Sequence, residues 1–261
     1  KVTNAYENKM VMGREAIADK GVWTAKKRYI LNVYDMEGVR FKEPHLKIMG
    51  IEAVKSSTPA PCREKLKEAL KIIMSGDEKE LNTFIQDFRE EFMALPPEDI
   101  AYPRSVNGIE KFSDNAISRK RTIDKKEERE NKKRKEPTIF GQLDGTTVAY
   151  GLFASGAPIH VKGAILYNHL IEKKNLSSKF PYIQEGEKIR FVHMQEPNIY
   201  QSSAFSFVTK LPRELDIIDK IDYDTQYEKS FVEPLRFISE KIGWRIDNSY
   251  GTQGTLEDFF G

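Results

Sequence analysis

Three consecutive cations followed by a tyrosine are the residues in this sequence whose types and spacing best suit the binding of a polyanion. They are Lys26, Lys27, Arg28 and Tyr29, and the alternation of side chains over 26–34 predicts a β-strand. A strand holds its side chains at fixed positions, so its cations would form a rigid charged edge that recognises a shaped polyanion. A solvated strand end is the alternative, and the three cations alone do not decide between the two.

Two acidic residues in the second half of the chain have the spacing of a metal site. Asp222 and Asp224 lie two residues apart, and paired carboxylates can hold divalent ions for phosphoryl or nucleotidyl transfer. They follow a polar stretch, however, and lead into a predicted helix, without the apolar flanks that would present both carboxylates from a hairpin. We therefore expect them to cap the helix or to be solvated.

Other catalytic signatures are missing from the sequence. It contains no phosphate-cradling glycine loop, no nucleophile elbow and no Cys/His metal spacing. The histidines are scattered, and we expect structural or surface roles for them: His45, His160, His169 and His193.

The C-terminal residues carry a different kind of pattern. Gln253, Leu256, Phe259 and Phe260 follow the order Gln-x-x-aliphatic-x-x-aromatic-aromatic. A single helical turn from Leu256 would place the three apolar side chains on one side as a hydrophobic plug. This pattern resembles the peptide that docks into ring-shaped sliding clamps. Packing onto the chain's own core is the alternative, and the position of the pattern favours docking.

The cationic segment belongs to a predicted antiparallel sheet over 10–52. Strands are predicted at 10–17, 26–34, 39–42 and 45–52, with loops at 19–21 and 35–38. Two antiparallel helices are predicted next. Thr58 is the expected N-cap of the first with Pro59 in its first turn, Gly76 ends it, and Asp77 caps the second, which closes at 96–97.

The remainder of the chain is predicted to be mixed. Residues 119–135 hold ten Lys/Arg, four Asp/Glu and one aliphatic residue, and are expected to form a mobile or weakly helical basic arm. Alternation over 159–165 and the pattern over 187–194 predict strands within a β-rich stretch at 138–208. A helix is predicted over 226–242.

Composition limits the classes of function and the location. The net charge is only +2, from 42 basic and 40 acidic residues, so an anion site must come from local clustering. The single Cys62 excludes an internal disulfide and is typical of a reducing compartment. No apolar run of membrane-spanning length and no secretory pattern occurs, so we expect a cytoplasmic protein and no membrane partner. The opening Lys1 indicates a segment of something longer, or a processed piece.

Several separated motifs together resemble one protein family. They are 26–29, 35–38, 46–50, 55–59, 158–163, 185–188 and the Phe-rich end, and they occur in the same order as in the replicative family B DNA polymerases of T-even-type bacteriophages. The resemblance covers nearly the whole chain. It implies an α+β fold in which 1–54 form the end of the antiparallel palm sheet and 55–248 a mixed helical and β-rich thumb. Residues 249–261 would be the clamp-binding tail, and the basic arm near 119–135 would be an insertion.

The resemblance also implies roles for individual residues. The motif Lys26, Lys27, Arg28 and Tyr29 would hold the primer–template end, and the thumb would contribute further DNA contacts from Lys55, Arg104, Ser105, His160 and Lys162. Gln253, Leu256, Phe259 and Phe260 would bind the sliding clamp. The family's catalytic aspartates lie in upstream motifs that this chain does not contain, so Mg²⁺ would be bound outside it.

The implied function is therefore that of a segment within a DNA-directed DNA polymerase acting in the bacterial host cell. Its partners would be primer–template duplex DNA, the sliding clamp and the remaining polymerase chain with the exonuclease, fingers and catalytic palm. The segment alone is expected to be inactive. A non-enzymatic DNA-binding processivity or adaptor protein that recruits a clamp is the alternative.

Overall fold

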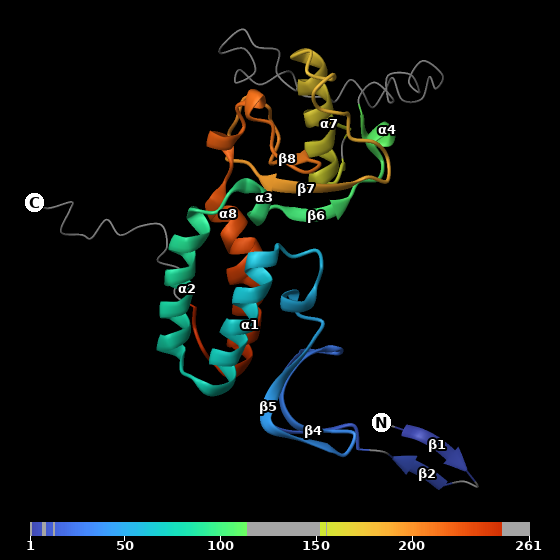
Figure 1. Cartoon of the computed structure of the whole chain (residues 1–261), viewed down its shortest axis with the longest axis vertical. Helices are drawn as coiled ribbons and strands as arrows, with labels where there is room; N and C mark the ends of the chain where they lie inside the picture. The colour runs from blue at the N-terminus through green and yellow to red at the C-terminus, as the bar shows by residue number, and fades with distance from the viewer. Residues whose placement is uncertain (1, 7–8, 13, 114–151, 155, 247–261) are drawn as a thin grey trace, which may run out of the picture. The chain divides into compact units, whose positions relative to one another are not determined.

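The computed structural model describes residues 2–6, 9–12, 14–113, 152–154 and 156–246. The chain divides into two compact units, each described by itself below (Figure 1). Unit 1 comprises Lys1–Ala94 and Tyr227–Gly261, and unit 2 comprises Leu95–Gln226. Both combine helices with an antiparallel sheet, so the predicted α+β class is confirmed. The predicted palm, thumb and tail boundaries are functional divisions, and they stay predictions.

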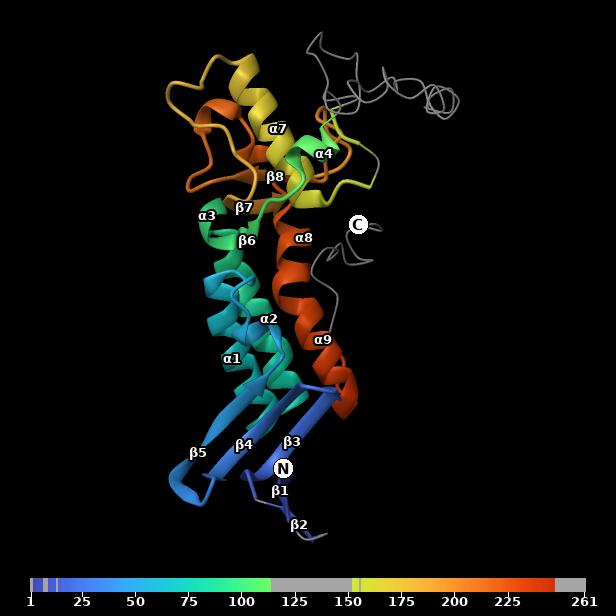
Figure 2. The same cartoon turned by 90° about the vertical axis from the view of Figure 1, so that its right-hand side faces the viewer.

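Unit 1 begins with two antiparallel sheets. The first pairs β1 (Val2–Tyr6) with β2 (Lys9–Met12). The second has the order β3-β4-β5, formed by β3 (Ala16–Ala25), β4 (Arg28–Met36) and β5 (Val39–Met49), which lie side by side in Figure 2. The predicted sheet over 10–52 therefore exists, with different strand bounds.

Several predicted bounds within this sheet differ from the structure. The loop expected at 19–21 lies inside β3, where register shifts keep the strand in the ladder and Asn32 donates a hydrogen bond to Asp19 over 2.8 Å. The strands predicted at 39–42 and 45–52 are one strand. Pro44 does not interrupt it because β5 is at the edge of its sheet, where a missing N–H costs no ladder bond. The single strand expected at 10–17 is divided between β2 and β3.

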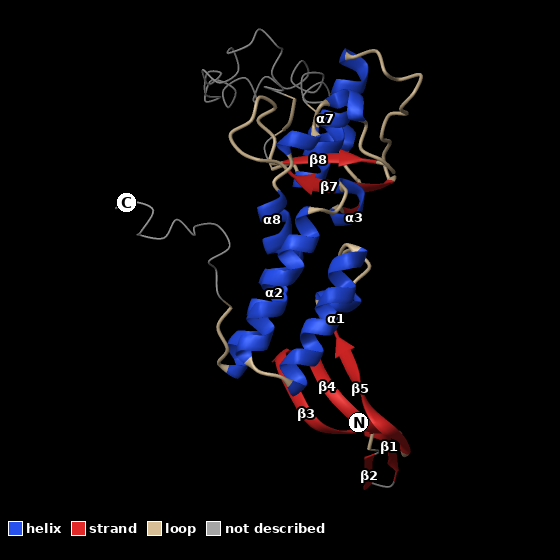
Figure 3. Ribbon diagram, turned by 60° about the vertical axis from the view of Figure 1, so that its left-hand side comes forward, coloured by secondary structure: helices blue, strands red, loops and turns tan. Residues whose placement is uncertain are grey.

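Two antiparallel helices follow the 3₁₀ turn η1 (Glu52–Val54), as predicted (Figure 3). They are α1 (Ala60–Ser75) and α2 (Glu78–Met93). Asp77 caps α2 by accepting a hydrogen bond from the Glu80 amide over 2.8 Å, and Gly76 ends α1. The cap of α1 is Pro59 and not Thr58, so this helix begins one residue later than predicted.

The C-terminal helical run completes the core of unit 1. It consists of a π-helical turn η5 (Glu228–Val232), α9 (Glu233–Ser239) and the 3₁₀ turn η6 (Glu240–Ile242). These follow α8 (Tyr223–Tyr227), most of which belongs to unit 2, so the predicted helix over 226–242 is confirmed. Pro234 has no N–H to donate to the preceding turn, which accounts for the wider spacing before it. Phe231 packs edge-on against Phe88 with ring centroids 4.6 Å apart.

Unit 2 contains a sheet of order β6-β7-β8 with a long helix against it. The strands are β6 (Tyr102–Ser105), β7 (Lys188–His193) and β8 (Ala204–Phe207), and the helix is α7 (Ile159–Lys173). Shorter elements complete the unit: α3 (Pro97–Ile100), α4 (Ile109–Phe112), η3 (Arg213–Leu215) and η4 (Ile218–Lys220). The strand predicted over 187–194 is confirmed by β7.

The strand predicted over 159–165 was wrong, because this segment opens α7. Almost every residue from Val161 to Tyr167 is buried, so the local pattern does not reveal a helical period. Gly163 lets α7 approach β8 closely, since a Cβ atom there would lie 2.7 Å from the Ser206 amide nitrogen. No helix among the described residues is long and apolar enough to span a membrane.

Candidate nucleic-acid interface

Lys26 and Lys27 form the two-residue turn between β3 and β4, which we call the lysine turn. The strand predicted over 26–34 therefore begins at Arg28. Lys27, the second residue of the turn, has a φ of 64°, in the left-handed region. Both lysines are exposed, so their ammonium groups lie at the tip of a hairpin and not along a strand edge.

An aromatic pair lies beside the lysine turn. Trp23 and Tyr29 are paired across β3 and β4, with ring centroids 6.2 Å apart, and Trp23 is 62% exposed. Exposed aromatic faces next to cations are typical of surfaces that bind nucleic acids. Sequence reasoning selected Tyr29 but missed Trp23, although the lysine run begins only three residues after it.

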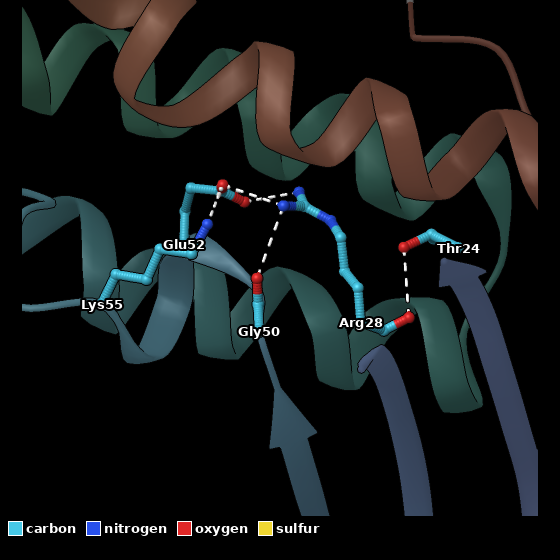
Figure 4. Close-up of polar contacts among 5 residues, drawn as sticks. All are labelled: Thr24, Arg28, Gly50, Glu52 and Lys55. Atoms are coloured by element: carbon cyan, nitrogen blue, oxygen red, sulfur yellow. Dashed lines mark hydrogen bonds and ion pairs between the residues drawn. The ribbon is translucent and has the colours of Figure 1, made fainter. Parts of the chain in front are cut away.

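Arg28 behaves differently from the two lysines, because its guanidinium is engaged within unit 1 (Figure 4). Its Nη1 and Nη2 atoms donate to the two carboxylate oxygens of Glu52 over 3.0 Å and 2.6 Å. Nη1 also lies 3.4 Å from the Gly50 carbonyl oxygen, and the guanidinium lies over the Phe237 ring, 5.0 Å from its centroid. Sequence reasoning gave no sign of Glu52 or Phe237 as partners.

Glu52 connects Arg28 with Lys55, which donates to it over 2.8 Å. Burial by itself raises the pKa of Glu52, but hydrogen bonds from Arg28 and Lys55 outweigh this effect and lower the pKa overall. The carboxylate is therefore charged at neutral pH. Lys55, a predicted DNA contact, is held beside it.

A pocket of about 380 Å³ adjoins this ion pair. Its lining residues are Arg28, Glu52, Lys229, Glu233, Pro234 and Phe237. Two cations and two carboxylates face it, so it has no excess of positive charge with which to attract a polyanion. The exposed Lys26 and Lys27 of the lysine turn are not among its lining residues.

Unit 2 contains the other predicted DNA contacts. Arg104 and Ser105 are exposed at the end of β6, and His160 and Lys162 lie in the first turns of α7. Burial lowers the pKa of His160, and the positive charge of Arg104 lowers it further. The charge of Arg104 in β6 therefore acts on His160, which lies in the first turn of a 15-residue helix, where the peptide dipoles favour anions.

The acidic pair has the structural role expected of its first member. Asp222 caps α8, because its two carboxylate oxygens accept from the Thr225 amide over 2.8 Å and the Thr225 hydroxyl over 2.6 Å. In the described part of the chain no three His, Cys, Asp or Glu side chains are placed to hold a metal ion. The basic arm at 119–135 and the predicted clamp-binding residues Gln253, Leu256, Phe259 and Phe260 lie outside the described residues.

Comparison with known proteins shows two similar DNA-directed DNA polymerases. The chain is 31% identical over 270 residues to that of Enterobacteria phage T4, and 32% identical over 270 residues to that of Escherichia phage RB69. The matches cover 99% and 98% of this chain. The resemblance to T-even-type phage DNA polymerases is confirmed. This polymerase-related chain spans about a quarter of the length of either relative, and no family model matches it.

Proposed function

We propose that this chain is the C-terminal segment of a DNA-directed DNA polymerase and that it holds the primer–template duplex. Residues 1–54 would complete the palm, 55–248 would form the thumb, and 249–261 would dock on the sliding clamp. The catalytic aspartates and Mg²⁺ would lie outside this chain, together with the exonuclease and fingers. The similarity to two phage polymerases over almost the whole chain supports this proposal.

The geometry of the lysine turn is the observation that carries the DNA-holding role. Two exposed ammonium groups lie at a hairpin tip next to the Trp23–Tyr29 pair. A polymerase must hold every sequence that it copies. Phosphate contacts position a duplex without reading it, and minor-groove acceptors are nearly the same for all base pairs. Exposed lysines and a tyrosine are suited to both kinds of contact.

Residues of β6 and α7 support a second contact along the duplex backbone. Arg104 acts electrostatically on His160 in the first turn of α7, where the helix dipole adds partial positive charge, and Ser105 and Lys162 lie near them in sequence. Lys55 is a weaker candidate for the duplex contact, because its ammonium group already donates to Glu52. The thumb contact would therefore come mainly from unit 2.

Salt-dependent binding to a fluorescent primer–template tests the DNA-holding role. The full chain should bind the duplex weakly, and the logarithm of its association constant should fall linearly with the logarithm of salt concentration. Lys26→Ala and Lys27→Ala should each reduce that slope by about 0.9, the contribution of one phosphate contact. Lys67→Ala removes the same charge from α1 in unit 1 and is the matched control. Unchanged slopes for both turn variants would contradict the proposal.

A primer-extension assay tests the proposal that the catalytic residues of the polymerase lie outside this chain. Given Mg²⁺ and the four nucleoside triphosphates, the purified chain should leave the primer at its original length on a sequencing gel. The reason is that the metal-binding aspartates are proposed to lie outside it. Extension by the chain alone, at a rate that scales with its concentration through purification, would overturn the proposal.

A further inference from the structure

We propose that Arg28 is a positioning residue, which holds the lysine turn against α9 and η1 and does not itself contact DNA. This inference rests on the proposed function, because it assigns the direct contacts to Lys26, Lys27 and Tyr29 and removes one cation from them. The positioning role is inferred from the location of the Arg28 guanidinium between Glu52 and Phe237.

The two terminal nitrogens of Arg28 already donate within unit 1, and its Nε is buried without a hydrogen-bond partner among the described residues. The planar guanidinium faces the Glu52 carboxylate with two parallel hydrogen bonds, of 3.0 Å and 2.6 Å, which is the bidentate geometry that lysine cannot make. The two side chains are only 20% and 24% exposed. A phosphate would have to displace Glu52, whose carboxylate also holds Lys55.

The contacts of Arg28 reach both ends of the lysine turn. Arg28 follows Lys27 directly, and its carbonyl oxygen accepts from the Thr24 hydroxyl over 3.3 Å. Gly50 packs so closely on the turn that a Cβ atom there would overlap the Lys27 carbonyl oxygen. Arg28 reaches the carbonyl of the same glycine. The lysine turn is thus held by the close backbone contact between Gly50 and Lys27 and by the ion pair between Arg28 and Glu52.

Phe237 supplies the third contact and extends the link to α9. The Arg28 guanidinium lies 5.0 Å and the Lys241 ammonium 5.6 Å from the centroid of its ring. These cation–π contacts explain why a phenylalanine occurs at a position that is 41% exposed. Phe237 belongs to the predicted thumb, and Glu52 to the predicted end of the palm. Arg28 would therefore fix the lysine turn to a helix of the thumb.

Variants at position 28 separate positioning from direct contact. Arg28→Ala should weaken primer–template binding by about three- to tenfold and leave the salt slope unchanged. Arg28→Lys should lose most of the same affinity, because it keeps the charge but not the bidentate geometry. A direct phosphate contact predicts the opposite pattern: a slope reduced by about 0.9 in Arg28→Ala and near-normal binding by Arg28→Lys. That pattern would overturn the inference.

Glu52→Gln gives the sharpest test, because the two roles predict effects of opposite sign. If Arg28 positions the turn, losing the carboxylate weakens DNA binding as Arg28→Ala does, and the double variant is no worse than either single one. If Arg28 can contact phosphate, its release from Glu52 strengthens binding and steepens the salt slope. Because Glu52 also holds Lys55, the comparison is repeated with Lys55→Ala in both proteins, and stronger binding by Glu52→Gln in that background would refute positioning.

Controls separate this inference from general loss of stability and from failure of the proposed function. Glu91→Gln breaks the 2.9 Å ion pair between Lys65 and Glu91 in the same unit and should leave affinity and slope unchanged. Binding is compared well below the Tm of every variant. Phe237→Leu keeps apolar volume and should cause a smaller loss in the same direction as Arg28→Ala. If Lys26→Ala and Lys27→Ala have no effect, the proposed function fails. If Lys26→Ala and Lys27→Ala behave as expected but the variants of Arg28 and Glu52 do not, the proposed function stands and only the positioning role of Arg28 is contradicted.

Discussion

His160 shows how one side chain at the candidate interface is tuned by its neighbours. Its pKa is lowered by burial and then by Arg104. Arg104→Ala should therefore raise the pKa of His160, as followed by NMR titration of the imidazole ring. Lys173→Ala is the matched control, because Lys173 lowers the pKa of His169 instead. If the pKa of His160 does not rise in Arg104→Ala, the two side chains are not neighbours in solution.

The same shift has a consequence for stability. Because the pKa of His160 is lower in the folded chain, the unfolded chain takes up this proton first as pH falls through its ordinary value of about 6.5. Acidification below that value should therefore reduce the free energy of unfolding, as measured in urea. His160→Gln should lose part of this dependence, whereas no difference from the wild type would contradict it.

Cys62 gives a second prediction at the scale of a residue. Burial raises the pKa of its thiol to about 11, although the Ser230 hydroxyl lies 3.3 Å away and acts in the opposite direction. The thiol should therefore react slowly with a disulfide reagent at pH 8 in the folded chain and rapidly in urea. Rapid labelling of the folded chain would show that this part of unit 1 opens readily.

The residues that the sequence singled out were identified by type, but their partners were not. The run from Lys26 to Tyr29 stands out because cations and an aromatic residue are adjacent. The pairing of Arg28 with Glu52 and Phe237 depends on a strand end, a 3₁₀ turn and a distant helix meeting in space. No local pattern carries that information, so one cation of three could not be distinguished from the others.

At the scale of elements, Gly50 and Gly38 form a matched pair for testing how the lysine turn is held. Both have positive φ, of 69° and 91°, so alanine at either position costs about 1–2 kcal/mol of backbone strain. Only at Gly50 would the added Cβ overlap the Lys27 carbonyl oxygen. Gly50→Ala should therefore lower the free energy of unfolding by about 1 kcal/mol or more beyond Gly38→Ala.

The same pair of variants should differ in DNA binding. Gly50→Ala displaces the turn and should weaken primer–template binding, whereas Gly38→Ala should bind like the wild type, because nothing lies within 4 Å of its added Cβ. Fluorescence anisotropy at fixed salt measures both. Equal affinities would mean that the position of the turn does not matter for binding.

The elements themselves were predictable where caps and periodicity agree. Gly76 and Asp77 located the end of α1 and the start of α2, because the residues at a helix terminus are local features of the sequence. The start of α7 failed for the opposite reason. The start of α7 is buried on nearly all sides, and its Gly163 lies against β8. Packing against β8 therefore determines which residues occur there, and the apolar residues show no helical periodicity.

For the whole molecule, the order of the motifs made the polymerase resemblance predictable from the sequence. Which segments of the chain make up each of the two units could not be predicted. Unit 1 joins the predicted end of the palm to α1, α2 and the C-terminal helical run, which are far apart in sequence. The contacts that create this grouping, such as Phe88 with Phe231, arise only on folding. Sequence patterns described each segment separately and did not show which segments share a core.

The predicted tail gives a test at this scale. Phe259→Ala together with Phe260→Ala should abolish clamp-dependent processivity of the complete polymerase, because two apolar anchors of the plug are lost. DNA affinity without the clamp should be nearly unchanged. Clamp binding that survives the double change would show that the tail is not the docking segment.

The position of Phe237 in the chain also bears on how the protein is made. The ring that lies under Arg28 leaves the ribosome only after the whole of unit 2 has been synthesised, although Arg28 itself emerges early. Throughout that interval the β3–β4 hairpin exists without its aromatic support. The contact between Phe237 and Arg28 can therefore form only late in synthesis, after the whole of unit 2 has emerged.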